Sequence, residues 1–119
     1  MANKPYIAEW VYRVKWGHQN EFFDIFRKYQ IPVLNREKEL GYVRDYAVYS
    51  PSLHTSEDAR WDYRVIITYN DPASAGHAEE ISNKLFPDRA ALNREEQRRW
   101  EITEVHWDLL IHVVDVGKE

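Results

Sequence analysis

The chain has 119 residues, a length typical of one small folded domain, and we expect residues 1–119 to form a single unit. Hydrophobic residues make up 44% and charged residues 30% of it, which excludes a disordered chain. The net charge is −4, and no run of lysine or arginine stands apart from acidic neighbours, so neither nucleic acid nor an anionic membrane is an expected partner.

Cysteine is absent, which excludes disulfides, thiolate metal sites and cysteine nucleophiles. The residues after Met1 carry no apolar stretch of the signal-peptide type, and no later apolar run approaches the roughly 20 residues that cross a bilayer. We therefore expect a cytoplasmic protein.

The first predicted element is a strand over residues 6–16, where every second residue is apolar. After Gly17 the apolar spacing changes to three and four residues, from Phe22 to Leu40, which predicts a helix with one buried face. Gly41 is expected to end this helix, because helices often end on a left-handed glycine. Pro32 is expected to kink or interrupt it, since proline lacks the backbone donor.

Two further strands are predicted over residues 42–49 and 61–69, separated by a polar loop over residues 50–60. The second of these strands is the clearest, because every second residue from Trp61 to Tyr69 is apolar. The loop could be a lid over a binding site or a disordered segment, and its length and polarity permit both.

A second helical region is predicted to begin at Asp71 and Pro72, which suit an N-cap and a first turn. It is expected to break near Pro87 and to resume from Asp88 to about residue 107, with a solvated charged face. Residues 109–116 are apolar on both parities except for His112 and Asp115, which predicts a last strand covered on both sides.

The order strand, helix, strand, strand, helix, strand predicts an α+β, ferredoxin-like fold, in which a four-stranded antiparallel sheet carries both helices on one face. The first, third and fourth strands carry apolar residues on both parities, so the second face also needs a cover. We therefore expect a homodimer.

From Tyr6 to Val116 the chain resembles the dimeric α/β-barrel group of ferredoxin-like proteins. The resemblance rests on the element order, the aromatic first strand, the helix containing Pro32 and the exit at Gly41-Tyr42, without a signature motif. It implies two sheets packed face to face around a shared interior. The group includes antibiotic-biosynthesis-type monooxygenases, haem-degrading enzymes, muconolactone-isomerase-like enzymes and many proteins of unknown activity, so it limits function only weakly.

The main candidate site is the mixed face of the central strands, where Arg13 and Lys15 should lie on the same side as Asp62 and Arg64. His112 on the last strand and Asp45 on the second strand could join them. The arginines could bind a carboxylate or enolate, with His112 as proton acceptor. The alternative, which we favour, is a salt-bridge network of Arg13, Arg64, Asp45 and Asp62 across the sheet or the dimer interface.

The opposite face of the central strands is aromatic, with Trp10, Tyr12, Trp16, Trp61, Tyr63 and Tyr69. These rings could line a pocket for a planar ligand. We favour the alternative that they form the core beneath the helices, because an aromatic stripe at strand period normally faces the packed side.

The remaining histidines are weaker candidates. His18 and His77 could act as catalytic bases, and His77 with Glu80 offers at most two metal ligands, so no metal site is expected. Haem ligation by His77 is an alternative that the resemblance implies, because some haem-degrading relatives use a histidine of the second helix.

With 4 glycines, at positions 17, 41, 76 and 117, the chain has no nucleotide-binding or nucleophile-elbow motif, and no cofactor is expected. Three functions stay open. The protein could be a cofactor-independent enzyme for a small aromatic or carbonyl-bearing molecule, a non-catalytic binder of such a molecule, or a structural or interaction protein that only dimerises.

Overall fold

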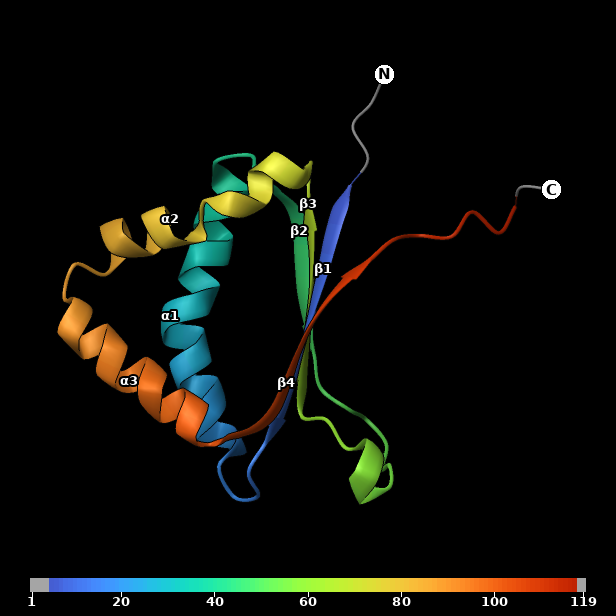
Figure 1. Ribbon diagram of the computed structural model, residues 1–119, viewed down its shortest axis with the longest axis vertical. Coiled ribbons are helices and arrows are strands. Elements are labelled where there is room, and N and C mark those ends of the chain that lie inside the picture. Colours follow the sequence, from blue (N-terminus) through green and yellow to red (C-terminus); the bar gives the residue numbers. More distant parts are fainter. Residues whose placement is uncertain (1–4, 118–119) are drawn as a thin grey trace.

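The computed structural model describes residues 5–117, which form one four-stranded antiparallel sheet with helices on one of its faces (Figure 1). The elements in chain order are β1 (Tyr6–Val14), α1 (Gln19–Glu39), β2 (Val43–Tyr49), η1 (Glu57–Ala59), β3 (Tyr63–Tyr69), η2 (Pro72–Gly76), α2 (Ala78–Leu85), α3 (Arg89–Glu101) and β4 (Thr103–Ile111). The strand order is β2-β3-β1-β4. The predicted ferredoxin-like fold is confirmed, with the second helical region divided into α2 and α3.

The core lies between the sheet and α1. Alternate residues of β1 and β3 point to this helix side, and Tyr12, Val65 and Ile67 are buried there against Phe22 and Phe26. The ring of Tyr63 stacks on those of Phe22 and Phe23. The prediction that the aromatic stripe faces the helices is therefore confirmed for Trp10, Tyr12, Tyr63 and Tyr69, which all belong to this core or pack on it.

Helix α1 is continuous from Gln19 to Glu39, so the predicted interruption at Pro32 was wrong, and the predicted kink stays a prediction. Phe26 before the proline and Leu34 after it both belong to the core against the sheet, and this packing holds the helix on both sides of Pro32. Gly41 has φ +85°, a left-handed conformation that glycine adopts without strain, and it ends the helix as predicted.

The last strand is displaced from its predicted position. Helix α3 ends at Glu101, and β4 occupies residues 103–111, which had been predicted as helix up to about residue 107. Ile102 is buried and its carbonyl accepts a hydrogen bond from the backbone N–H of Lys15, which brings the following residues alongside β1. Residues 112–117 have no regular structure and are exposed.

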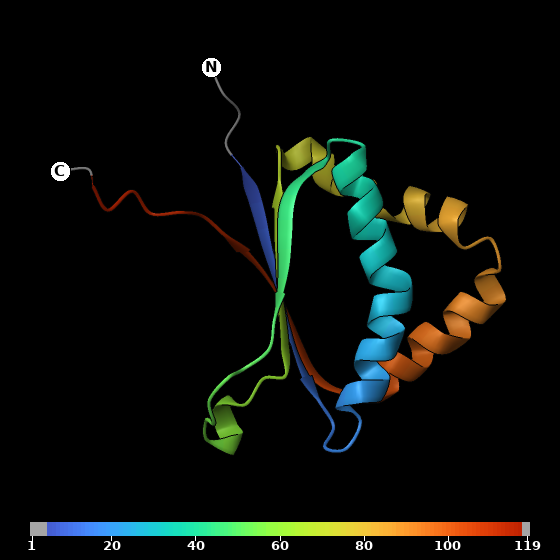
Figure 2. The ribbon, with the colours of Figure 1, turned by 180° about the vertical axis from the view of Figure 1, so that it is seen from behind.

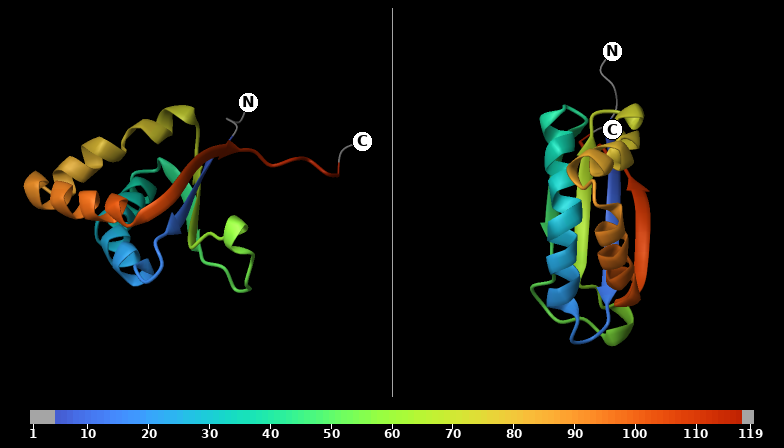
Figure 3. Two further views of the ribbon diagram at one scale, coloured as in Figure 1. Left: turned by 60° about the horizontal axis from the view of Figure 1, so that its bottom comes forward. Right: turned by 90° about the vertical axis from the view of Figure 1, so that its left-hand side faces the viewer.

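The second face of the sheet, the open face, has no helix over it (Figures 1 and 2). The strand register places the following residues on it: Ile7, Glu9, Val11 and Arg13 of β1, Arg64, Ile66 and Thr68 of β3, and Val105, Trp107, Leu109 and Ile111 of β4. The right-hand view of Figure 3 shows the other face of the sheet, which the helices cover. Within the described residues, no helix is both long and apolar enough to cross a membrane.

Candidate ligand site on the open face

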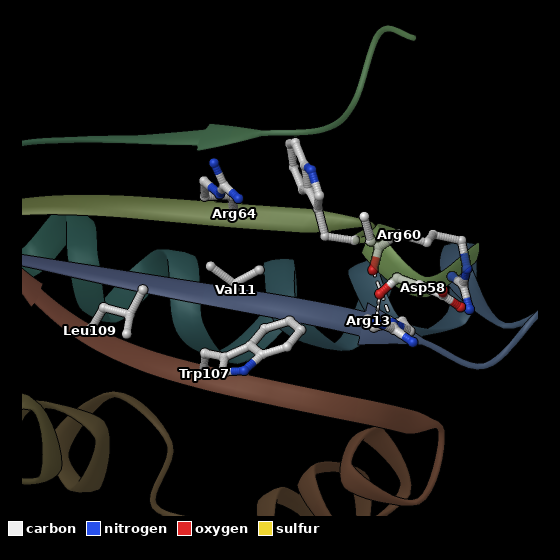
Figure 4. A pocket seen from close by; sticks show the side chains of 9 residues that line it. Val11, Arg13, Asp58, Arg60, Arg64, Trp107 and Leu109 are labelled. Carbon is white, nitrogen blue, oxygen red and sulfur yellow. Dashed lines mark hydrogen bonds between the residues drawn. The ribbon is translucent and has the colours of Figure 1, made fainter. Parts of the chain in front are cut away.

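A pocket of about 340 Å³ lies at one end of the open face (Figure 4). Its floor is formed by β1 and β4, with Val11, Trp107 and Leu109, and its rim is formed by β3 and the end of the β2–β3 loop. The lining residues are Val11, Arg13, Asp58, Ala59, Arg60, Trp61, Arg64, Trp107 and Leu109. The pocket therefore combines guanidinium groups with two indole rings.

Arg64 presents its guanidinium group to this pocket. Its Nε atom lies 3.1 Å from a carboxylate oxygen of Glu9, and its Cζ atom lies 4.5 Å from the ring centroid of Trp61. Among residues 5–117, no hydrogen bond is made by its Nη atoms. Because Glu9 and Trp61 hold the base of the guanidinium group, its outer edge remains available for a planar anion.

Arg13 holds the β2–β3 loop against the sheet. Its Nε donates to the carbonyl of Arg60 at 2.9 Å, and its Nη2 donates to the carbonyl of Asp58 at 3.0 Å. Its Nη1 lies 3.7 Å from Glu104. Two of its donors thus bind neutral carbonyls, and among residues 5–117 its ion pair is the 3.7 Å contact with the partly exposed carboxylate of Glu104. The lid role of the loop stays a prediction, but its last residues are anchored.

Arg60 completes this anchor from the other side of the loop. Its side chain is 9% exposed, and its guanidinium group contacts the carboxylates of Glu57, Asp62 and Glu104. The distance from its Nη1 atom to Oδ2 of Asp62 is 2.6 Å. It also donates to the carbonyl of Val14 and lies 4.2 Å from the ring centroid of Trp16. A buried cation with this many partners fixes the loop to the end of β1.

Asp62 and Asp45 do not join Arg13 and Arg64, so the predicted four-residue salt-bridge network does not form within the chain. Asp62 accepts from the backbone N–H of Val14 at 2.7 Å and pairs with Arg60. It precedes β3, where the chain bends, and so it leaves the face of Arg64. Asp45 lies on the edge strand β2 and pairs with Lys38 of α1 at 3.4 Å.

His112 lies at the opposite end of the sheet from the arginines. It follows Ile111, which pairs with Ile7, whereas Arg13 pairs with Val105. Six residues of strand correspond to about 20 Å, so His112 of the same chain is out of reach of a ligand held by Arg13 and Arg64. Lys15 follows the end of β1 and is exposed.

The weaker histidine candidates lie away from the open-face pocket. His18 stands at the start of α1 with its Nδ1 atom 3.2 Å from Glu21, and His77 stacks on Tyr42 with 3.9 Å between ring centroids. His77 occupies the N-cap position of α2, on the side of the sheet that carries the helices. In the part of the chain that the structure describes, no three His, Asp or Glu side chains are grouped so that they could hold a metal ion.

Two tryptophans assigned to the core were predicted wrongly, and one of them belongs to the pocket. Trp61 stands two residues before β3 and packs on Arg64. Trp16 is 66% exposed beyond the end of β1. Glu9 and Trp107 were not singled out from the sequence, although Glu9 shares the strand parity of Arg13 and was visible on that ground.

Comparison with known proteins supplies the fold but no family. No protein-family model matches the chain, and no curated protein matches it. A dimeric ferredoxin-like protein from an uncultured marine organism is 9% identical, with 95% of this chain and 90% of that chain covered and a TM-score of 0.64. A NIPSNAP family protein from Agrobacterium tumefaciens is 16% identical, with coverage of 98% and 91% and a TM-score of 0.57.

A third similar structure is a protein from Nitrosomonas europaea, provisionally assigned as an antibiotic biosynthesis monooxygenase. It is 9% identical, with coverage of 98% and 96% and a TM-score of 0.61. These likenesses confirm the ferredoxin-like fold and its resemblance to antibiotic-biosynthesis-monooxygenase-like proteins. At identities this low they carry no activity to this chain.

Proposed function

We propose that the chain forms a homodimer through its open faces and that the open-face pocket, closed by the second copy, binds a small organic anion with a planar apolar body. The observation that carries the proposal is the convergence of Arg13 and Arg64 with Trp61 and Trp107 around one pocket of about 340 Å³. That volume suits a ligand of metabolite size.

The side chains of the pocket favour a carboxylate or enolate over a neutral ligand. A guanidinium group binds planar oxyanions through two parallel hydrogen bonds, and in the described part of the chain the partners of Arg64 are Glu9, at Nε, and the ring of Trp61, which leaves its outer edge for such an anion. Trp61 and Trp107 offer ring faces to the apolar part of such a molecule. No nucleotide cofactor is part of the proposal, and haem is not either, because His77 packs on Tyr42 away from this pocket.

The homodimer follows from the apolar character of the open face. Trp107 and Leu109 are 40% and 46% exposed on it, beside Val11 and Ile66. A large exposed apolar patch marks a contact surface, and a twofold pair covers the same patch on both copies. Several structures of this fold come from proteins described as dimeric.

Sedimentation equilibrium of the purified protein at micromolar concentration is expected to give twice the mass of 14.3 kDa. The physical reason is the burial of the apolar open face in the pair. A single species of monomer mass at these concentrations would contradict the homodimer and with it the closed pocket.

The Arg64→Met variant is expected to bind 2-naphthoate at least about tenfold more weakly than the unchanged protein, because it loses the hydrogen bonds of the guanidinium group to the carboxylate. Isothermal titration calorimetry measures the affinity. Arg94→Met is the matched control, since Arg94 is exposed on α3 and far from the pocket. Neutral 2-naphthamide is expected to bind both variants equally.

A specific observation favours one other function, that of a dimeric structural or interaction protein. Arg13 already uses its donors on the loop, and Arg64 is paired with Glu9. On this alternative the partner's side chains fill the pocket. A crystal structure of the dimer with a dry, filled pocket, together with no heat from 2-naphthoate, would replace the binding proposal with the structural one.

A further inference from the structure

The C-terminal arm, residues 112–117, carries three valines and is exposed along its whole length. Val113, Val114 and Val116 are 81%, 66% and 92% exposed, and Leu110 just before the arm is 65% exposed. Within the described chain, the hydrogen bond of the arm is one from Gly117 to Asp115. Residues 112–116, part of the segment 109–116 that was predicted to be a strand covered on both sides, are thus exposed and outside the sheet.

The arm extends toward the side of the open face. In Figures 1 and 2 it leaves the end of β4 and runs away from the helices. Its polar residues are His112 and Asp115, so it has no basic cluster that would suit an anionic surface. Three exposed valines gathered in one short segment favour contact with an apolar partner.

A hollow of about 320 Å³ lies where the arm leaves the sheet. It is lined by Pro5 and Ile7 of the first segment and by His112 and Val113 of the arm itself. Ile7 belongs to the open face. One chain therefore carries, on the face that we propose to be paired, three exposed valines and the hollow that the base of its arm forms with Ile7.

We propose that the arm docks on a second copy of this chain, with its valines packed against the open face and hollow of that copy. A twofold interface requires that the same surface carry both complementary parts, and the arm and the hollow meet this requirement. Exchange of arms also places the exposed backbone of residues 112–117 where it can pair with the partner's chain. The inference rests on the proposed homodimer and adds the element that clasps it.

Two measurements test the arm. Hydrogen exchange at the amides of residues 112–117 is expected to be slowed at least about 100-fold relative to an unstructured chain in the dimer. Sedimentation equilibrium of the variant Val113→Ser/Val114→Ser/Val116→Ser, and of a chain that ends at Ile111, is expected to show a dimer dissociation constant about 100-fold higher.

Leu85→Ser is the matched control, because Leu85 is a 41% exposed apolar residue at the end of α2, on the helix side of the sheet. It is expected to leave the dissociation constant unchanged. If the unchanged protein is a monomer, both the homodimer and the arm exchange are wrong. If it is a dimer but the amide hydrogens of residues 112–117 exchange as fast as in an unstructured chain, the homodimer stands and the arm inference is overturned. The same holds if the serine variant dissociates no more readily than the unchanged protein.

Discussion

Arg60→Met is expected to lower the free energy of unfolding by about 3–5 kcal/mol, the loss typical of a buried ion pair from which one partner is removed. The variant leaves Asp62, whose side chain is 12% exposed, without its cation and leaves the carbonyl of Val14 without a donor. Urea denaturation at one fixed protein concentration measures the change, because dimerisation makes stability depend on concentration.

Arg36→Met is the matched control for this prediction. Arg36 is 48% exposed and pairs with Glu39 at 3.4 Å, so its removal is expected to change stability by less than about 1 kcal/mol. Hydrogen exchange in residues 51–61 should also rise in the Arg60 variant, since the loop loses its anchor. Equal effects of the two substitutions would mean that the contacts of Arg60 do not hold the loop.

Glu37→Gln is expected to make the free energy of unfolding less sensitive to pH between pH 5 and 8. Its free energy of unfolding relative to that of the unchanged protein is expected to rise by about 2 kcal/mol across this range. Glu37 is 1% exposed on α1, and within the described residues its Oε2 atom has no hydrogen-bond partner. Burial disfavours the charged form and raises the pKa of this carboxyl from 4.5 to about 7.

Stability falls with rising pH because the folded and unfolded chains hold the Glu37 proton over different pH ranges. Between pH 4.5 and about 7 the folded protein keeps the Glu37 proton while the unfolded chain releases it, so unfolding becomes easier as the pH rises. The contribution of Glu37 to stability is complete below pH 4.5 and is lost as the pH rises through its folded pKa of about 7. Glutamine keeps the shape and cannot ionise, so it escapes this loss.

Urea denaturation at several pH values gives the difference between the two proteins, in which the effects of the histidines cancel. Glu39→Gln serves as the control, because Glu39 is 67% exposed on the same helix. The difference in free energy of unfolding between this variant and the unchanged protein is expected to stay constant as the pH changes. Parallel curves for Glu37→Gln and the unchanged protein would show that the carboxyl of Glu37 is hydrated or paired in solution.

Much of the fold followed from local patterns. The alternation in β1 and β3 and the apolar spacing of α1 identified these elements and the side on which Tyr12 and Tyr63 pack. The start of β4 was missed, although Thr103, Val105 and Trp107 alternate with polar residues, because the charged pattern of α3 continues into them without a glycine or proline. Pairing with β1 overrides the helical pattern at that point.

The candidate site was predicted in part. Strand parity correctly grouped Arg13 with Arg64, but it misplaced Trp61 and Asp62, which precede β3 where the alternation no longer applies. Asp45 and His112 were separated from the arginines by the strand register, which determines how far along the sheet each residue lies. Parity is a local property, whereas register depends on which strands meet.

The sequence by itself determined the class of fold, the helix-side core and the presence of an apolar second face, because each of these depends on the period of apolar residues along the chain. Only the tertiary structure decided that Arg64 keeps a free edge beside Trp61 and that Arg60 anchors the loop. It also decided that the valines of the arm lie uncovered. These features depend on contacts between residues far apart in the sequence, and no local pattern specifies such contacts.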